Sequence, residues 1–169
     1  VIEMAYYGAQ IIHPKTIKPL QNKGIPLYVK SFLDPSLPGT IIHDKPVHHL
    51  PPVIVLKEKQ AMLEMSSRDF SFVGEKHVGH LYHLLEKLHI KPNLTQNGAI
   101  SFLCVLDDRP EKIEKLALEA SAFLDVQATK GLSLLTIRHY NKDIFEKLTT
   151  GKTFLLRQQT PETIQVLMR

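Results

Sequence analysis

Three histidines at three-residue spacing, His77, His80 and His83, are the clearest candidates for metal chemistry in this chain. Imidazole nitrogens bind zinc and related metals, and the first two side chains would share one face of a helix. The third lies further around such a helix, and no nearby cysteine or acidic pattern completes a tetrahedral set. A solvated helix face is therefore the better interpretation, as is solvent exposure for His48 and His49, and we predict no metal site.

The single cysteine, Cys104, excludes an intramolecular disulfide. Both of its neighbours on each side are apolar, so we interpret it as a buried strand residue and not as a nucleophile. No serine-histidine-acid set stands at the spacing of a known catalytic motif. Arg138-His139-Tyr140 lies at the end of a predicted strand, and we assign no catalytic role to it. The chain therefore carries no catalytic constellation that its residues alone identify.

The composition is that of a globular protein with one ordinary or two small domains: 169 residues, 43% hydrophobic and 22% charged. The net charge of +4 is dispersed, because lysines alternate with glutamates and form no stripe of the kind that binds nucleic acid. No run of roughly 18 apolar residues could span a membrane, and no signal peptide is visible. We expect a cytoplasmic protein that binds neither nucleic acid nor membrane. Because the chain opens with Val1 directly into a helical pattern, we also expect it to be part of a longer protein.

The middle of the chain predicts the order strand, helix, strand, strand, helix, strand. Both helices have an apolar face at helical spacing, and Asp108 is a plausible cap for the second. Asn97-Gly98 is a strong hairpin signal between the two central strands. The predicted strands are 61–67, 91–96, 99–106 and 125–129, and the first helix is 77–89. This is an α+β, ferredoxin-like order, with two helices on one face of an antiparallel sheet.

The flanking segments predict two further parts. At the N-terminal end, two short helices up to about residue 22 precede a strand over 25–32, and a proline- and histidine-rich linker follows over 43–52. At the C-terminal end, a shortened second copy of the middle unit is predicted, with Asn141 capping its one helix. The expected domains are 1–50, 51–130 and 131–169.

Two stretches of the N-terminal part carry a family resemblance: Met4-Ala5-Tyr6-Tyr7-Gly8-Ala9-Gln10-Ile11-Ile12-His13-Pro14-Lys15-Thr16-Ile17, and the motifs from Gly24-Ile25-Pro26 to Pro38-Gly39-Thr40. They resemble the end of the aspartate kinase catalytic domain, and the following alternation of elements resembles the ACT domains of that family. The resemblance implies a regulatory, amino-acid-sensing region of the enzyme that phosphorylates aspartate with ATP in the first step of the lysine, threonine and methionine pathway.

The resemblance also implies what this chain lacks. Family members begin with a Lys-Phe-Gly-Gly segment that acts on the phosphates, and neither it nor a glycine-rich phosphate loop is present. We therefore predict that the fragment catalyses no phosphoryl transfer and needs no cofactor, whereas the parent enzyme uses ATP and magnesium. Gln10 and Ile11 match positions that contact ATP in relatives. Many relatives have lysine in place of Gln10, and an exposed amide is the alternative interpretation.

An effector site is implied where ACT domains bind amino acids, near the end of the first strand and the start of the first helix. The helix amides would hold the ligand carboxylate, and Gly74 would allow close approach. Asn93 and Ala99 replace acidic residues of lysine-inhibited relatives, which argues against lysine as the effector. Lysine, threonine, another ligand and no ligand at all stay open as alternatives. The expected effector-binding residues are Ser66, Ser67, Phe72, Val73, Gly74, Glu75, Asn93 and Asn97.

The resemblance further implies partners: an amino-acid effector, the chain's own kinase domain, and a second copy paired through the ACT domains. Two alternatives stay open. One is a free-standing small-molecule-binding ACT module, against which the first 40 or so residues argue. The other is a nucleic-acid-binding sheet of similar topology, which would need exposed aromatics on its central strands.

Overall fold

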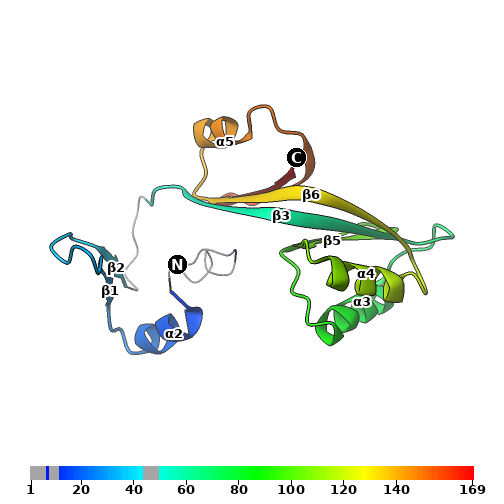
Figure 1. The fold of residues 1–169 in the computed structure, drawn as a ribbon, viewed down its shortest axis with the longest axis horizontal. Coiled ribbons are helices and arrows are strands. Elements are labelled where there is room, and N and C mark those ends of the chain that lie inside the picture. The colour runs from blue at the N-terminus through cyan, green and yellow to red at the C-terminus, as the bar shows by residue number, and fades with distance from the viewer. Residues whose placement is uncertain (1–6, 8–11, 44–49) are drawn as a thin grey trace. The chain divides into compact units, whose positions relative to one another are not determined.

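The computed structural model describes residues 7, 12–43 and 50–169 of the chain (Figure 1). The chain divides into two compact units, which are described separately below. None of the helices among the described residues is long and apolar enough to cross a membrane. The first unit comprises Val1–Val55, Thr136–Thr150 and Gln159–Ile164, and the second comprises Leu56–Leu135, Gly151–Gln158 and Gln165–Arg169.

One six-stranded sheet is the main feature of the fold, with the strand order β4-β5-β3-β6-β8-β7. Its first four strands in the chain alternate with helices α3 and α4 as β3-α3-β4-β5-α4-β6. The order β4-β5-β3-β6 is that of a ferredoxin-like sheet, which confirms the predicted fold class. The elements are β3 (Val53–Ser66), α3 (Glu75–Lys87), β4 (Leu94–Asn97), β5 (Ser101–Asp107), α4 (Pro110–Ala120), β6 (Asp125–Arg138), α5 (Lys142–Thr149), β7 (Phe154–Gln159) and β8 (Thr163–Met168).

The last three strands repeat this pattern in shortened form. β6 is followed by α5, β7 and β8, and the order β3-β6-β8-β7 places β8 beside β6 and β7 beyond it, as in the first copy. β3 occupies the position of the fourth strand of this second copy. The two long strands β3 and β6, with 14 residues each, therefore serve both copies of the pattern.

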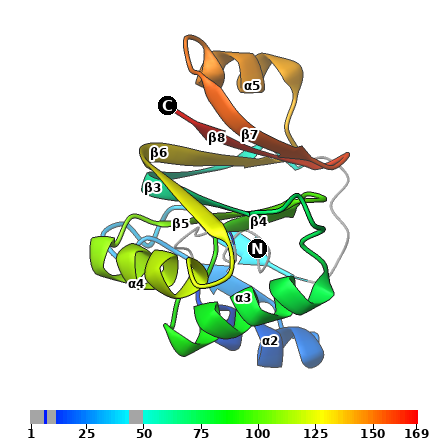
Figure 2. The same cartoon turned by 90° about the vertical axis from the view of Figure 1, so that its right-hand side faces the viewer.

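Helices α3 and α4 lie together on one face of the sheet and bury its main core (Figure 2). Strand alternation sends every second side chain of β3 and β5 to this face, so that Leu63 pairs with Cys104 and Met65 with Phe102. Tyr82 of α3 is 45% exposed, whereas Leu84 is buried. The helical residues of the core are Leu81, Leu84, Leu85, Ile113, Leu116 and Ala120.

A second, smaller core lies on the other face of these strands. It joins Met62 and Val105 to Leu134 of β6 and Leu167 of β8. The strands at the two ends of the sheet order also touch, because Gln158 Nε2 of β7 donates a hydrogen bond to Thr95 O of β4 at 2.9 Å. The sheet therefore curls around this second core.

The two long strands differ most from the prediction. β3 begins at Val53, eight residues before the predicted start at 61, and β6 continues through the boundary predicted at residue 131. Each strand contains one residue in the left-handed region, Lys59 with φ 53° in β3 and Gly131 with φ 71° in β6. Neither residue ends its strand, because β3 continues to Ser66 and β6 continues to Arg138.

Two predicted local signals also differ from the structure. The turn lies two residues further along the chain than predicted, because Asn97 pairs with Phe102 and the Gly98 amide donates to Ser101 O at 2.8 Å, which leaves Ala99 and Ile100 at the tip. Helix α4 begins at Pro110 with Arg109 as its N-cap, and no side chain caps it. The prediction of Asp108 as the cap was therefore wrong: the proline sets the first helical position one residue further on.

In the other unit, helix α2 (Pro14–Asn22) is capped by His13, whose Nδ1 accepts the Lys15 amide at 3.1 Å. The strand predicted over 25–32 is shorter, and it pairs with a second strand that the sequence did not indicate. Gly39 is required there, because a Cβ at this positive-φ position would collide with Val29 O. The paired strands are β1 (Leu27–Val29) and β2 (Thr40–Ile42).

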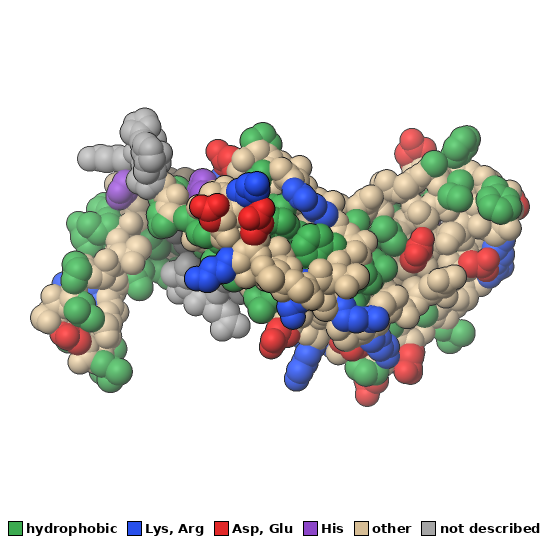
Figure 3. Space-filling model, turned by 90° about the horizontal axis from the view of Figure 1, so that it is seen from above, with side chains coloured by type: hydrophobic (Ala, Val, Ile, Leu, Met, Phe, Trp, Pro, Cys, Tyr) green, Lys and Arg blue, Asp and Glu red, His purple; other side chains and the backbone are tan. Residues whose placement is uncertain are grey.

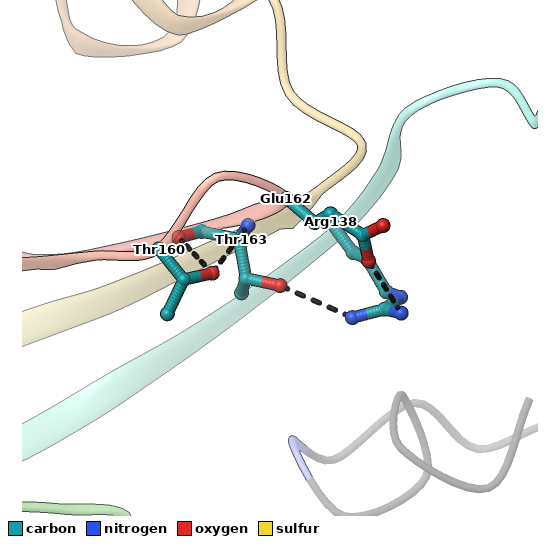
Figure 4. Close-up of polar contacts among 4 residues, drawn as sticks. All are labelled: Arg138, Thr160, Glu162 and Thr163. Carbon is teal, nitrogen blue, oxygen red and sulfur yellow. Dashed lines mark hydrogen bonds and ion pairs between the residues drawn. The ribbon is translucent and has the colours of Figure 1, made fainter.

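The C-terminal segments of that unit are held by side chains with structural roles. Asn141 Oδ1 accepts the Ile144 amide at 2.9 Å, which confirms the predicted cap of α5. Arg138, at the end of β6, forms an ion pair with Glu162 at 2.9 Å and donates to Thr163 Oγ1 at 3.3 Å (Figure 4). Arg138 thus ties the end of β6 to the turn between β7 and β8.

Candidate effector site

Two loops at one end of the sheet meet where the effector site is predicted. The connection from β3 to α3 follows Ser66, and the turn from β4 to β5 crosses it. Ser67 donates its amide to Ile100 O at 2.9 Å, and Val73 donates its amide to Ala99 O at 2.9 Å. Both ends of the β3–α3 connection are therefore held to the same turn, each by one backbone hydrogen bond.

Ser67 carries a hydroxyl that the fold leaves unused at this place. Its Oγ is buried and has no hydrogen-bond partner among the described residues. A buried hydroxyl without a partner costs about 1–3 kcal/mol on the scale of protein mutations. Such an atom is the kind of group that a bound polar ligand would satisfy.

The first turn of α3 lies at the other end of this connection. Gly74 is its N-cap and supplies no side-chain cap, so the amides of Glu75 and Lys76 have no partner from the cap residue. The protein itself does not require glycine here, because a Cβ at Gly74 would meet nothing within 4 Å and its φ is −81°. Space beside the helix start is thus open, and Glu75 is the acidic residue of the first turn.

The connection between Ser67 and Gly74 is fixed by residues that the sequence did not single out. Arg68 forms an ion pair with Asp125 at 3.0 Å and donates to Leu124 O at 3.2 Å. Asp69 closes a tight turn by accepting the Ser71 amide at 3.1 Å, and hydrogen bonds from the Ser71 hydroxyl and amide lower the pKa of Asp69. Arg68 and Asp125 are 57 residues apart, so no local pattern could have paired them.

Two aromatic side chains of the connection face solvent. Phe70 is 83% exposed and stands at φ 59°, and Phe72 is 77% exposed. Val73, by contrast, is buried in the main core. Among the predicted site residues, Phe72 therefore contributes an exposed apolar surface and Val73 anchors the helix start.

The two predicted asparagines lie at opposite ends of β4. Asn97 pairs with Phe102, near the end of the sheet that holds Ser66 and Ser67. Asn93 precedes β4 and lies four residues away, about 13 Å along a strand. The structure thus groups Asn97 with the loop residues and places Asn93 elsewhere.

Asn93 belongs to a separate polar cluster at the far end of the sheet. It accepts a hydrogen bond from Lys57 Nζ at 2.8 Å and donates to Gln60 Oε1 at 2.7 Å and Asp107 Oδ1 at 2.8 Å. Burial raises the pKa of Asp107, but hydrogen bonds from Asn93 and Gln60 and the charge of Lys57 outweigh it and hold that pKa below its usual value. This cluster satisfies its own hydrogen bonds.

The other candidate residues have structural surroundings. Cys104 is buried in the main core, and burial raises the pKa of its thiol to about 12, which agrees with an unreactive strand residue. His80 stacks on Phe123 with ring centroids 4.6 Å apart, and His77 stacks on the same ring at 6.3 Å. No group of three or more metal-binding side chains exists in the described ranges. Gln10 and Ile11 lie outside the described residues.

Neither the surface seen in Figure 3 nor the sheet resembles a nucleic-acid interface. Acidic and basic side chains are interspersed over the face that the figure shows. Phe102, the one aromatic residue of the central strands β3 and β5, is fully buried and could not stack on a base.

The fold is that of a ferredoxin-like ACT domain followed by an incomplete second copy. No family model matches the chain. Among curated relatives, aspartokinase 1 of Arabidopsis thaliana chloroplasts is 32% identical over 114 residues, covering 66% of this chain and 19% of its own length. Lysine-sensitive aspartokinase 3 of Escherichia coli is 26% identical over 164 residues, covering 89% of this chain and 34% of its own length.

Solved structures give the same result for the fold. Aspartate kinase from Clostridium acetobutylicum superposes with a TM-score of 0.81 at 20% identity, over 99% of this chain and 43% of that one. The regulatory subunit of aspartate kinase from Thermus thermophilus superposes with a TM-score of 0.51 at 10% identity, over 68% of this chain and 84% of that one. The chain corresponds to the C-terminal part of the aspartokinases. It spans about a fifth to a third of the length of the two curated relatives.

Proposed function

We propose that this chain is the amino-acid-sensing regulatory region of an aspartokinase, and that the sensor is the loop site around Ser67. The proposal rests on one observation above all: the buried, unpartnered Ser67 Oγ on the connection that leads to the start of α3, which has no side-chain cap. A free amino acid carries a carboxylate for the helix amides and polar groups for the hydroxyl. The E. coli relative is named as lysine-sensitive, which supports sensing as the role of this region.

The charges of the site favour an effector with a short uncharged side chain, such as threonine, over lysine. Lysine would need a second carboxylate for its side-chain ammonium. Ala99 cannot supply one, and Asn93 is engaged with Asp107 in the cluster at the other end of β4. Glu75 is the acidic group at the helix start, and it is exposed to solvent, where an ion pair contributes little.

The remaining parts of the enzyme are assigned by the same family relationship. The parent binds ATP and magnesium in its catalytic domain and transfers a phosphoryl group to aspartate. This region pairs with a second copy, and its effector-bound state changes the activity of the catalytic domain. Such coupling requires the effector to bind two states of the enzyme with different affinity. The isolated chain should therefore bind the effector but turn over no ATP.

A melting-temperature screen with threonine, lysine and other aspartate-derived amino acids tests the proposal. Ligand at 100 times its dissociation constant stabilises by about 2.7 kcal/mol, which is a shift of roughly 5–10 °C for a chain of this size. We expect the shift with threonine. If no amino acid moves the melting temperature, the sensing role is wrong.

Ser67→Ala separates a ligand contact from a packing role. Removing an unsatisfied buried hydroxyl should leave the free protein as stable or up to about 1 kcal/mol more stable. The same change should weaken effector binding by about tenfold, the value of one lost hydrogen bond to a charged or polar ligand group. Ser121→Ala, an exposed position at the end of α4, is the matched control and should change neither quantity.

A further inference from the structure

The end of helix α4 receives a positive charge from a distant part of the chain. The helix ends at Ala120 with Ser121 as its C-cap, and its last turn contains no basic residue. The last carbonyls of a helix have no partner within it and carry the negative end of the helix dipole. Arg68 Nη2 donates to Ser121 O at 2.5 Å and to Leu124 O at 3.2 Å. Its Nε also forms the ion pair with Asp125, so one guanidinium group holds the end of α4 and the first residue of β6.

The first turns of α3 contact the same connection through stacked rings. Phe123 lies between α4 and β6, and its ring stacks on His80 with centroids 4.6 Å apart and 6° between the ring planes. His77 stacks on the same ring at 6.3 Å. His77 is the third residue of α3, and its amide donates to Gly74 O at 3.0 Å. The α4–β6 connection, residues 121–124, is therefore held both by Arg68 and by the beginning of α3.

These two contacts involve the two halves of the proposed effector site. Arg68 directly follows Ser67, whose buried hydroxyl has no partner among the described residues. His77 directly follows Glu75 and Lys76, whose amides at the helix start would meet the ligand carboxylate. Besides the turn that binds their backbone amides, the two halves of the site thus share a second support, which is the α4–β6 connection.

We propose that Arg68 is a positioning residue of the effector site, which acts through the α4–β6 connection. By gripping this connection, Arg68 fixes the place of the Ser67 hydroxyl relative to the start of α3. A ligand that uses both groups binds more tightly when they are already in place, because ordering them on binding costs free energy. The inference rests on the proposed function, since the site is that of the effector, but its first test needs no ligand.

Amide hydrogen exchange of the effector-free chain, followed by NMR, is this first test. The amides of Ser67 and Val73 donate hydrogen bonds within the protein, so they exchange when the site opens locally. Arg68→Gln should speed the exchange of both amides about tenfold, the effect of losing one hydrogen bond from a charged group. Lys87→Gln is the matched control and should leave both rates unchanged. It removes the same charge and an ion pair between α3 and α4, with Glu119 at 2.8 Å, without touching the α4–β6 connection.

Phe123→Leu acts on the other contact of the connection and gives a second variant. It removes the ring that stacks on the two histidines but keeps an apolar side chain, and it should speed the exchange of the Ser67 and Val73 amides in the same way. Wild-type exchange of these amides in both Arg68→Gln and Phe123→Leu would overturn the positioning role, even if both variants melt at lower temperature.

Calorimetric titration with threonine is the second test. Arg68→Gln should raise the dissociation constant about tenfold, whereas Lys87→Gln should leave it unchanged. An unchanged dissociation constant in Arg68→Gln would also overturn the positioning role, because an arginine that only stabilises the fold would not alter binding well below the melting temperature. If the wild type binds no amino acid, the proposed function is wrong, and the exchange rates still decide whether Arg68 positions Ser67.

Discussion

Gly131→Ala tests whether β6 requires a glycine at its centre. Gly131 has φ 71°, in the left-handed region, and a Cβ there would meet no heavy atom within 4 Å. The cost of alanine is therefore backbone strain alone, about 1–2 kcal/mol, without a steric clash. Since β6 serves both copies of the sheet pattern, the whole fold should lose this stability in one transition.

Gly79→Ala is the matched control for this change. Gly79 lies inside α3, and a Cβ there also meets nothing within 4 Å, but its backbone is helical. Alanine should stabilise this exposed helix by about 0.5–1 kcal/mol. The same addition of one methyl group is thus expected to act with opposite sign at the two positions.

Urea denaturation of the wild type and both variants gives the measurement. The midpoint should fall for Gly131→Ala and rise for Gly79→Ala, with stabilities roughly 2 kcal/mol apart and similar slopes. On heating, that difference is about 4–8 °C for a chain of this length. Equal stability of the two variants would refute the reasoning, because it would mean that residue 131 does not need a positive φ.

Three other changes have definite outcomes. Asn93→Ala should reduce the loss of unfolding free energy on acidification, measured by urea denaturation at several pH values. The lowered pKa of Asp107 stabilises the fold above about pH 4, and this stabilisation is lost as the pH falls through the folded-state pKa. A variant that is as acid-sensitive as the wild type would contradict this. Cys104 should resist iodoacetamide at pH 8 in the folded protein and react on unfolding, since its pKa is about 12, and rapid labelling of the native state would argue against burial. Asn141→Ala should cost about 1 kcal/mol in thermal unfolding, and no loss would show that the cap of α5 contributes nothing.

Local chemistry explains which elements the sequence predicted well. Helix α3 follows from the periodicity of its apolar residues, and the start of α5 follows from the capping preference of Asn141. The first half of β3 was missed because Lys57-Glu58-Lys59-Gln60 has no strand-like alternation. That segment is a strand because β6, more than 60 residues later, pairs with it. Pairing of this kind is a tertiary effect that local preference does not carry.

The candidate site was predictable in part for the same reason. The family resemblance located Ser67 and the start of α3, and the loops that form them are close in the chain. The contribution of Ile100 and Ala99 depends on hydrogen bonds across the sheet end, and the anchoring by Arg68 depends on a residue far along the chain. Asn93 was included from a matched position, and its separation from Ser67 becomes visible only with the register of β4 against β5.

An amide NMR titration of the isotope-labelled chain with threonine tests the sensing site most directly. The account predicts that the shifted signals cluster at Ser67, Val73, Glu75 and Ile100, with those of Lys57 and Asn93 unmoved. Signals that move only at the far end of β4, or none that move at saturating threonine or lysine, would contradict it.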